Sequence, residues 1–189
     1  ERTWTAEEFR ALPFETVPQT YDRDGILKKI DVVGSLLGVP EKTKALEDKV
    51  AADLDAAIAD SAKRPEAERK RVLFVLSNQN GKILASGTDT AADGIIKLAG
   101  AVNAITGFTG YKSLTDEAII DAKPDVILIM DREGPLSMTN DDLLKQPAIS
   151  LTPAASHKAI VRMDGLHLLG FGPRTASAVR ELNAAVYGG

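Results

Sequence analysis

The residues of this sequence best suited to bind a ligand are a tyrosine, a lysine, an arginine and a histidine: Tyr111, Lys112, Arg132 and His167. A phenol or an imidazole can ligate a metal ion, and the two cations can pair with an anionic group. No recognised enzyme motif accompanies them, because the sequence lacks a P-loop, a GxGxxG turn after a strand, an HExxH pair and a GxSxG elbow. The types of these residues are compatible with ligand binding, and the alternative that all four are ordinary surface residues stays open.

The two histidines and the absence of cysteine restrict the metal chemistry of the chain. A multi-histidine zinc site and a thiolate site are both excluded within this sequence. His157 lies in the polar loop PAASHK and is predicted to be solvated. His167 lies between apolar residues in GLHLLG, so it is either a packed histidine or a ligand.

The elements that must position these side chains alternate along the second part of the chain. Three short apolar runs rich in β-branched residues predict buried strands at 71–77, 126–130 and 159–163. This alternation of strands and amphipathic segments predicts an α/β fold in which a mostly parallel sheet carries helices on both faces. The predicted helices are 90–98, 115–123, 141–145 and 173–186.

Ligands of such sheets bind beyond the carboxyl ends of the strands. Asn78 follows the first predicted strand and Arg132 follows the second, so both belong to this rim. Two loops that can lean over the same rim carry Tyr111, Lys112 and His167. The sequence therefore predicts that these five residues lie at one end of the sheet.

The residues before the first of these strands have a different organisation. A short strand is predicted at 14–17, and apolar residues at helical spacing predict a helix from Gly25 that ends at Gly38. A second, longer helix is predicted at 41–63. Its apolar stripe is narrow, which is typical of a helix that lies across a surface or bridges two bodies. That stripe consists of Leu46, Val50, Leu54 and Ile58.

Composition excludes several classes of function. The formal net charge of −4 argues against nucleic-acid binding, which usually requires a basic patch. A hydrophobic fraction of 44% is enough for a real core, and no apolar run approaches the ~20 residues of a membrane span. The absence of cysteine is compatible with an oxidising compartment.

Three stretches carry a resemblance to a known family: GTDTAADGIIKLAGAVNAITG, GYKSLTDEAIIDAKPDVILIM and VRMDGLHLLGFGPRTASAVREL. They resemble the carboxyl-terminal lobe of the periplasmic haem-binding proteins that feed ABC haem importers. The resemblance extends from about Thr20 to the end of the chain. It implies two α/β lobes joined by one long helix, with the ligand clamped between them. The expected parts are a remnant of the first lobe at 1–40, the inter-lobe helix at 41–64 and the C-terminal lobe at 65–189.

The resemblance also implies roles for individual residues. Tyr111, the loop around Leu84 and the segment 166–171 match stretches that line the cleft, and Asn78 is added to this ligand-binding set. Haem is flat and apolar, its iron accepts tyrosine oxygen or histidine nitrogen, and its propionates attract cations. Candidate roles follow: Tyr111, His167 and Leu84 wall the haem, Tyr111 or His167 ligates its iron, and Lys112 or Arg132 meets a propionate or a phenolate from the other lobe.

Glu117 matches a surface glutamate that docks into the membrane permease in this class. An acidic residue in the first turn of a helix also complements the helix dipole, and the two interpretations are compatible.

The implied function is delivery of haem to an ABC permease, without catalysis, in the periplasm of a Gram-negative bacterium. The signal peptide and most of the first lobe are expected to lie outside this chain, and the face left uncovered is expected to promote self-association. A siderophore or corrinoid carrier is the alternative within the class, and a small α/β enzyme or regulatory domain is the alternative outside it.

Overall fold

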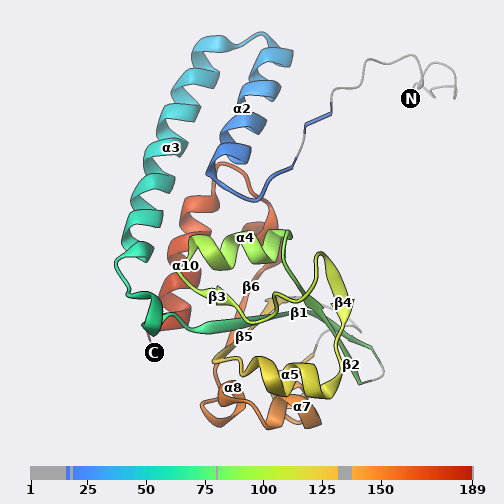
Figure 1. The fold of residues 1–189 in the computed structure, drawn as a ribbon. Helices are drawn as coiled ribbons and strands as arrows, with labels where there is room; N and C mark the ends of the chain where they lie inside the picture. The colour runs from blue at the N-terminus through green and yellow to red at the C-terminus, as the bar shows by residue number, and fades with distance from the viewer. Residues whose placement is uncertain (1–15, 18, 80, 132–137, 189) are drawn as a thin grey trace, which may run out of the picture.

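A computed structural model describes residues 16–17, 19–79, 81–131 and 138–188 of the chain. Residues 14–15 of the short predicted strand, and Arg132, lie outside this described part. Figure 1 shows a helical hairpin standing on a sheet with helices on both of its faces. The helices are α2 (Arg23–Leu37), α3 (Pro40–Ala62), η1 (Glu66–Glu68), α4 (Ala91–Leu98), α5 (Asp116–Ala122), α6 (Asn140–Leu144), α7 (Pro147–Ser150), α8 (Pro153–Ser156), α9 (Gly165–Leu169) and α10 (Thr175–Tyr187). The strands are β1 (Arg71–Gln79), β2 (Lys82–Ser86), β3 (Val102–Asn103), β4 (Tyr111–Ser113), β5 (Val126–Asp131) and β6 (Ile160–Asp164).

The centre of the sheet is parallel, as the continuous apolar strands predict. The strand order is β4-β2-β1-β5-β6, and β3 pairs with the first residues of β1. Both β1 with β5 and β5 with β6 are parallel pairs. Their carboxyl ends therefore meet at one edge, where Asp131 pairs with Asp164. The predicted α/β fold is confirmed.

One edge of the sheet is antiparallel, and no pattern in the sequence predicted this edge. Strand β2 returns along β1, and β4 then pairs with β2. A β-bulge interrupts the register of β1 between Val75 and Ser77. The sequence pattern indicated only a turn before β2 and a helix cap near Ser113, because these short strands are formed by hydrogen bonds to their neighbours and not by an apolar run of their own.

Helices cover both faces of the sheet and enclose two apolar cores. Val72, Phe74 and Leu128 face a core shared with α3, α4, α9 and α10. The alternate residues of the same strands, such as Leu73 and Ile127, face a second core with α5, α7 and α8. Figure 1 shows α4 on one side of the sheet and α5, α7 and α8 on the other.

The hairpin of α2 and α3 stands away from the sheet (Figure 1). Asp22 caps the first turn of α2, and Gly38 ends the helix with φ of 64°, a conformation that glycine adopts without a steric penalty. Helix α3 buries Val50, Leu54 and Ala57. Leu46, the first residue of the predicted stripe, is instead 39% exposed, because it lies near the free end of the hairpin. Within the described residues, no helix is long and apolar enough to cross a membrane.

Candidate functional site

Tyr111 and Leu84 share one face of the antiparallel edge. Tyr111 lies directly opposite Ser86, and Ser86 and Leu84 are two residues apart on β2, so all three side chains point to the same side. The Tyr111 ring packs edge-on against Phe74, with 6.4 Å between ring centroids, and the side chain remains 38% exposed. Leu84 is half-buried. The two residues therefore form a mainly apolar wall that can contact a ligand.

The Tyr111 hydroxyl lies near the start of α4. Burial raises the pKa of this phenol, and hydrogen bonding with the Thr90 side chain and the Ala92 backbone acts in the opposite direction with less effect. The phenol is therefore neutral at neutral pH. A metal ion bound to its oxygen would have to displace the proton.

Lys112 and Asn78 point to the opposite face from Tyr111. Lys112 lies opposite Ala85, and its ammonium group is 5.2 Å from the centroid of the Phe108 ring. Asn78 lies opposite Ile83, which belongs to the second core. The predicted set is therefore divided between the two faces of the sheet, and Arg132 lies outside the described residues.

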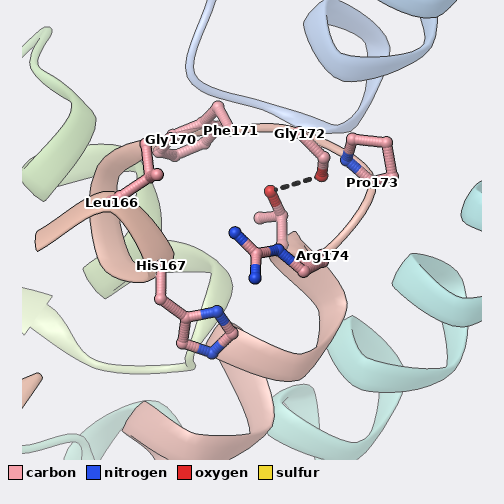
Figure 2. Close-up of a pocket in the computed structure, with 8 residues that line it drawn as sticks. Leu166, His167, Gly170, Phe171, Gly172, Pro173 and Arg174 are labelled. Carbon is pink, nitrogen blue, oxygen red and sulfur yellow. Dashed lines mark hydrogen bonds between the residues drawn. The ribbon is translucent and has the colours of Figure 1, made fainter. Parts of the chain in front are cut away.

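His167 contacts α10. Its backbone N–H donates to the Asp164 carboxylate at 2.7 Å, which begins α9 immediately after β6. Its Nε2 atom lies 3.2 Å from a carboxylate oxygen of Glu181, and the imidazole is 19% exposed. Figure 2 shows the ring directed toward α10. The structure therefore places His167 in a polar contact with a helix and does not pair it with Tyr111.

A hollow of about 160 Å³ lies beside α9 and is shown in Figure 2. Its cation, Arg174, was not among the residues predicted from the sequence, although the stretch VRMDGLHLLGFGPRTASAVREL that contains it carries part of the family resemblance. Tyr21 was not predicted from the sequence either. Its ring lies edge-on to the Phe171 ring, with 5.3 Å between the ring centroids, and this contact joins residues that are far apart in the sequence. The hollow is lined by Leu166, His167, Gly170, Phe171, Gly172, Pro173, Arg174 and Thr175.

Glu117 lies exposed in the first turn of α5, on the layer of helices that covers the second core. Hydrogen bonds from its own backbone N–H and from the Thr115 side chain lower the pKa of its carboxyl group. The carboxylate therefore stays ionised, which suits both the helix dipole and a cationic partner. Over the described parts of the chain, no cluster of three or more histidine, aspartate or glutamate residues is arranged to hold a metal ion.

The sequence of this chain matches a known protein family and a curated relative. The family profile described as "Periplasmic binding protein" matches residues 2–165. The uncharacterized ABC transporter substrate-binding lipoprotein YvrC of Bacillus subtilis (strain 168) is 26% identical over 172 residues, which make up 91% of this chain and 53% of that protein. The chain thus spans about half the length of this curated relative.

Solved structures of haem-binding proteins are more similar in sequence. The periplasmic haem-binding protein BhuT in complex with two haems is 39% identical, with a TM-score of 0.84 over 89% of this chain and 63% of that chain. RhuT from Roseiflexus sp. RS-1, in its apo form, is 34% identical with a TM-score of 0.81 over 89% and 64%. HutB of Vibrio cholerae, also a haem-binding protein, is 30% identical with a TM-score of 0.77 over 88% and 65%. This chain covers less than two thirds of each of them.

Proposed function

The chain belongs to the periplasmic binding protein family, and from this membership we propose that it is part of a carrier that delivers haem to an ABC-transporter permease. Proteins of this family and its structural neighbours bind solutes and are not enzymes. The single observation that carries the choice of haem is the sequence similarity to haem-binding structures. Three of them are 30–39% identical to this chain over 88–89% of its length.

The wall formed by Tyr111 and Leu84 supports haem as the ligand. A flat apolar macrocycle gains from contact with aromatic and aliphatic side chains, and its iron accepts a tyrosine oxygen. Tyr111 is the better iron candidate of the two named from the sequence, because the His167 imidazole is already engaged by Glu181. Lys112 points to the other face of its strand, which favours Arg132 or another cation as the partner of a propionate.

An apolar groove at the free end of the helical hairpin supports the proposed two-lobe organisation. It has a volume of about 290 Å³ and is lined by residues of α2 and α3 together with Pro173. We assign residues 1–40 to a first lobe, 41–64 to the linking helix and 65–189 to the second lobe. The rest of the first lobe would cover the groove, since exposed apolar patches of this kind mark interaction surfaces. The exposed apolar residues that line it are Val33, Leu37 and Leu46.

The remaining parts of the proposal concern the partner and the compartment. Glu117 is assigned to permease docking, because it is exposed, ionised and on a different layer from the ligand wall. The chain is assigned to the periplasm of a Gram-negative bacterium.

Titration of the full-length protein with hemin tests the function. A saturable Soret band with the features of tyrosinate-ligated iron is the expected result. An unchanged hemin spectrum in the presence of protein would reject haem. Complete displacement of bound hemin by a ferric siderophore or by cobalamin would favour the alternative carriers of the class.

A further inference from the structure

The cation that lines the hollow beside α9 has no role in the function proposed above. Figure 2 shows the guanidinium group of Arg174 directed into this hollow, next to the imidazole ring of His167. In the described ranges, no hydrogen bond or ion pair engages that guanidinium group. We call this space, lined by Leu166, His167 and residues 170–175, the Arg174 hollow.

The carboxylate of α10, the helix that follows Arg174, is already engaged by another residue. Glu181 lies on α10, two helical turns after Arg174, the residue that precedes this helix, and its carboxylate contacts His167 Nε2 at 3.2 Å. No ion pair between Glu181 and Arg174 is found among the described side chains. The arrangement therefore leaves the planar donor group of Arg174 available, and that group matches the geometry of a carboxylate.

The backbone that shapes the Arg174 hollow is held in an unfavourable conformation. Phe171 has φ of 44° although it is not glycine, and its side chain is 1% exposed. Such a residue persists only where its surroundings fix it, and residues of this kind cluster at functional sites. Here the Lys29 ammonium group donates to the Phe171 carbonyl oxygen at 2.9 Å, and the Tyr21 ring packs against the Phe171 ring. Thr175 Oγ1 donates to the Gly172 carbonyl oxygen at 2.8 Å, which closes the turn (Figure 2).

The position of the Arg174 hollow relates it to the ligand wall. Helix α9 begins directly at the carboxyl end of β6, on the edge where ligands of parallel sheets bind. Pro173 lines both the hollow and the groove assigned to the first lobe. Tyr21 and Phe171, whose rings contact each other, both lie against Gly94 of α4, one turn after Thr90, the cap of that helix.

We propose that Arg174 binds a carboxylate of the transported ligand, which for haem is a propionate; this rests on the proposed function. The chemistry is that of a bidentate guanidinium–carboxylate pair. A volume of about 160 Å³ accepts a short carboxylate-bearing chain but not a macrocycle. The ring system would therefore lie outside the hollow, with one propionate inside it.

The test compares hemin with hemin dimethyl ester, in which both propionates are blocked. In the full-length protein, Arg174→Met is expected to weaken hemin binding roughly 10- to 100-fold, because a charge-assisted hydrogen bond is lost. Binding of the dimethyl ester is expected to stay unchanged. Arg174→Lys keeps the charge without the fork and is expected to fall between wild type and Arg174→Met for hemin. Arg180→Met is the matched control, since Arg180 lies on α10 and donates to the Asp53 carbonyl oxygen at 3.0 Å, away from the hollow.

The outcomes separate this inference from the function on which it rests. An equal loss for hemin and for the ester in Arg174→Met, or no loss for either, overturns the propionate role while haem transport stands. The same overturning result would follow if Arg180→Met matched Arg174→Met. No Soret change with wild-type protein rejects haem as the ligand, and the propionate role with it. Thermal unfolding of each variant identifies one that has lost its fold; in that case Arg174→Gln, measured with the same two ligands, decides the result.

Discussion

Gly34 of α2 packs directly against Thr43 of α3, and both residues are buried. A Cβ atom on Gly34 would lie well inside van der Waals distance of the Thr43 side chain, whose hydroxyl donates to the Val39 carbonyl oxygen at 2.9 Å. The hairpin of α2 and α3 is therefore set by a contact that only glycine permits.

We predict that Gly34→Ala destabilises the protein although alanine favours helices. Alanine gains about 1 kcal/mol of helix propensity over glycine, whereas overpacking costs about 1–3 kcal/mol. A net loss of up to about 2 kcal/mol is expected in urea unfolding. Ser35→Ala is the control, because Ser35 follows Gly34 in the sequence and is exposed. This variant should change the free energy of unfolding by no more than about 0.5 kcal/mol. Equal stability of the two variants would contradict the prediction that Thr43 leaves no room for a side chain at position 34. Adding Thr43→Ala to Gly34→Ala should recover part of the lost stability.

Tyr111→Phe tests whether the phenol oxygen ligates iron. Phenylalanine keeps the apolar wall and the edge contact with Phe74, so only the oxygen is lost. In the full-length protein we expect a changed Soret band and a hemin affinity lower by at least about tenfold, as for the loss of a charge-assisted bond. Tyr21→Phe removes the hydroxyl group of the tyrosine that packs against Phe171 and should leave the spectrum unchanged. A wild-type spectrum from Tyr111→Phe would assign the iron to another residue.

His167→Gln is expected to leave the hemin spectrum as in wild type. Glutamine retains a polar group that can reach Glu181, so the packing between α9 and α10 should persist. A shift of the Soret band in this variant, without a change in its thermal unfolding, would show that His167 leaves Glu181 and ligates iron when haem binds.

The parts of the fold and the site that the sequence predicted are those that depend on local pattern. The run VILIM is continuous and apolar, so β5 and the parallel centre were predictable. Strand β4 consists of three exposed residues and exists only through its pairing with β2, so no local pattern indicates it. Tyr111 and Leu84, which the resemblance matched to cleft-lining stretches, lie on one face of the paired strands β4 and β2. Arg174 and Tyr21 acquire their positions from residues distant in sequence.

The face to which Asn78 points illustrates why side-chain direction was not predictable. Simple alternation from Val75 would put Asn78 on the face of Phe74 and Tyr111. The bulge between Val75 and Ser77 adds one residue and turns Asn78 to the opposite face, beside Ile83. Nothing in the sequence RVLFVLSNQ marks the bulge, since it arises from the return of β2 along β1.

Glu117→Gln is predicted to impair transport without impairing haem binding. The variant removes an exposed charge that lies on a different layer from the ligand wall, and its local cost at the helix start is only about 0.3–1 kcal/mol. Haem-stimulated ATPase activity of the importer in proteoliposomes should fall, while hemin titration of the isolated protein stays unchanged. Asp121→Asn, an exposed residue of the same helix, is the matched control. Equal ATPase stimulation by both variants would argue against docking through Glu117.

The groove at the end of the helical hairpin predicts that the 189-residue chain, expressed alone, self-associates. Burial of its apolar residues against a second copy removes them from water at about 25 cal/mol per Å². Light scattering after size exclusion should show a mass that rises with concentration, and Leu37→Lys should shift the chain toward monomer. Leu151→Lys is the matched control, because Leu37 and Leu151 are both 70% exposed but only Leu37 lines the groove. Dissociation by both variants alike would assign the association to general surface hydrophobicity, and a monomer at every concentration would contradict the prediction.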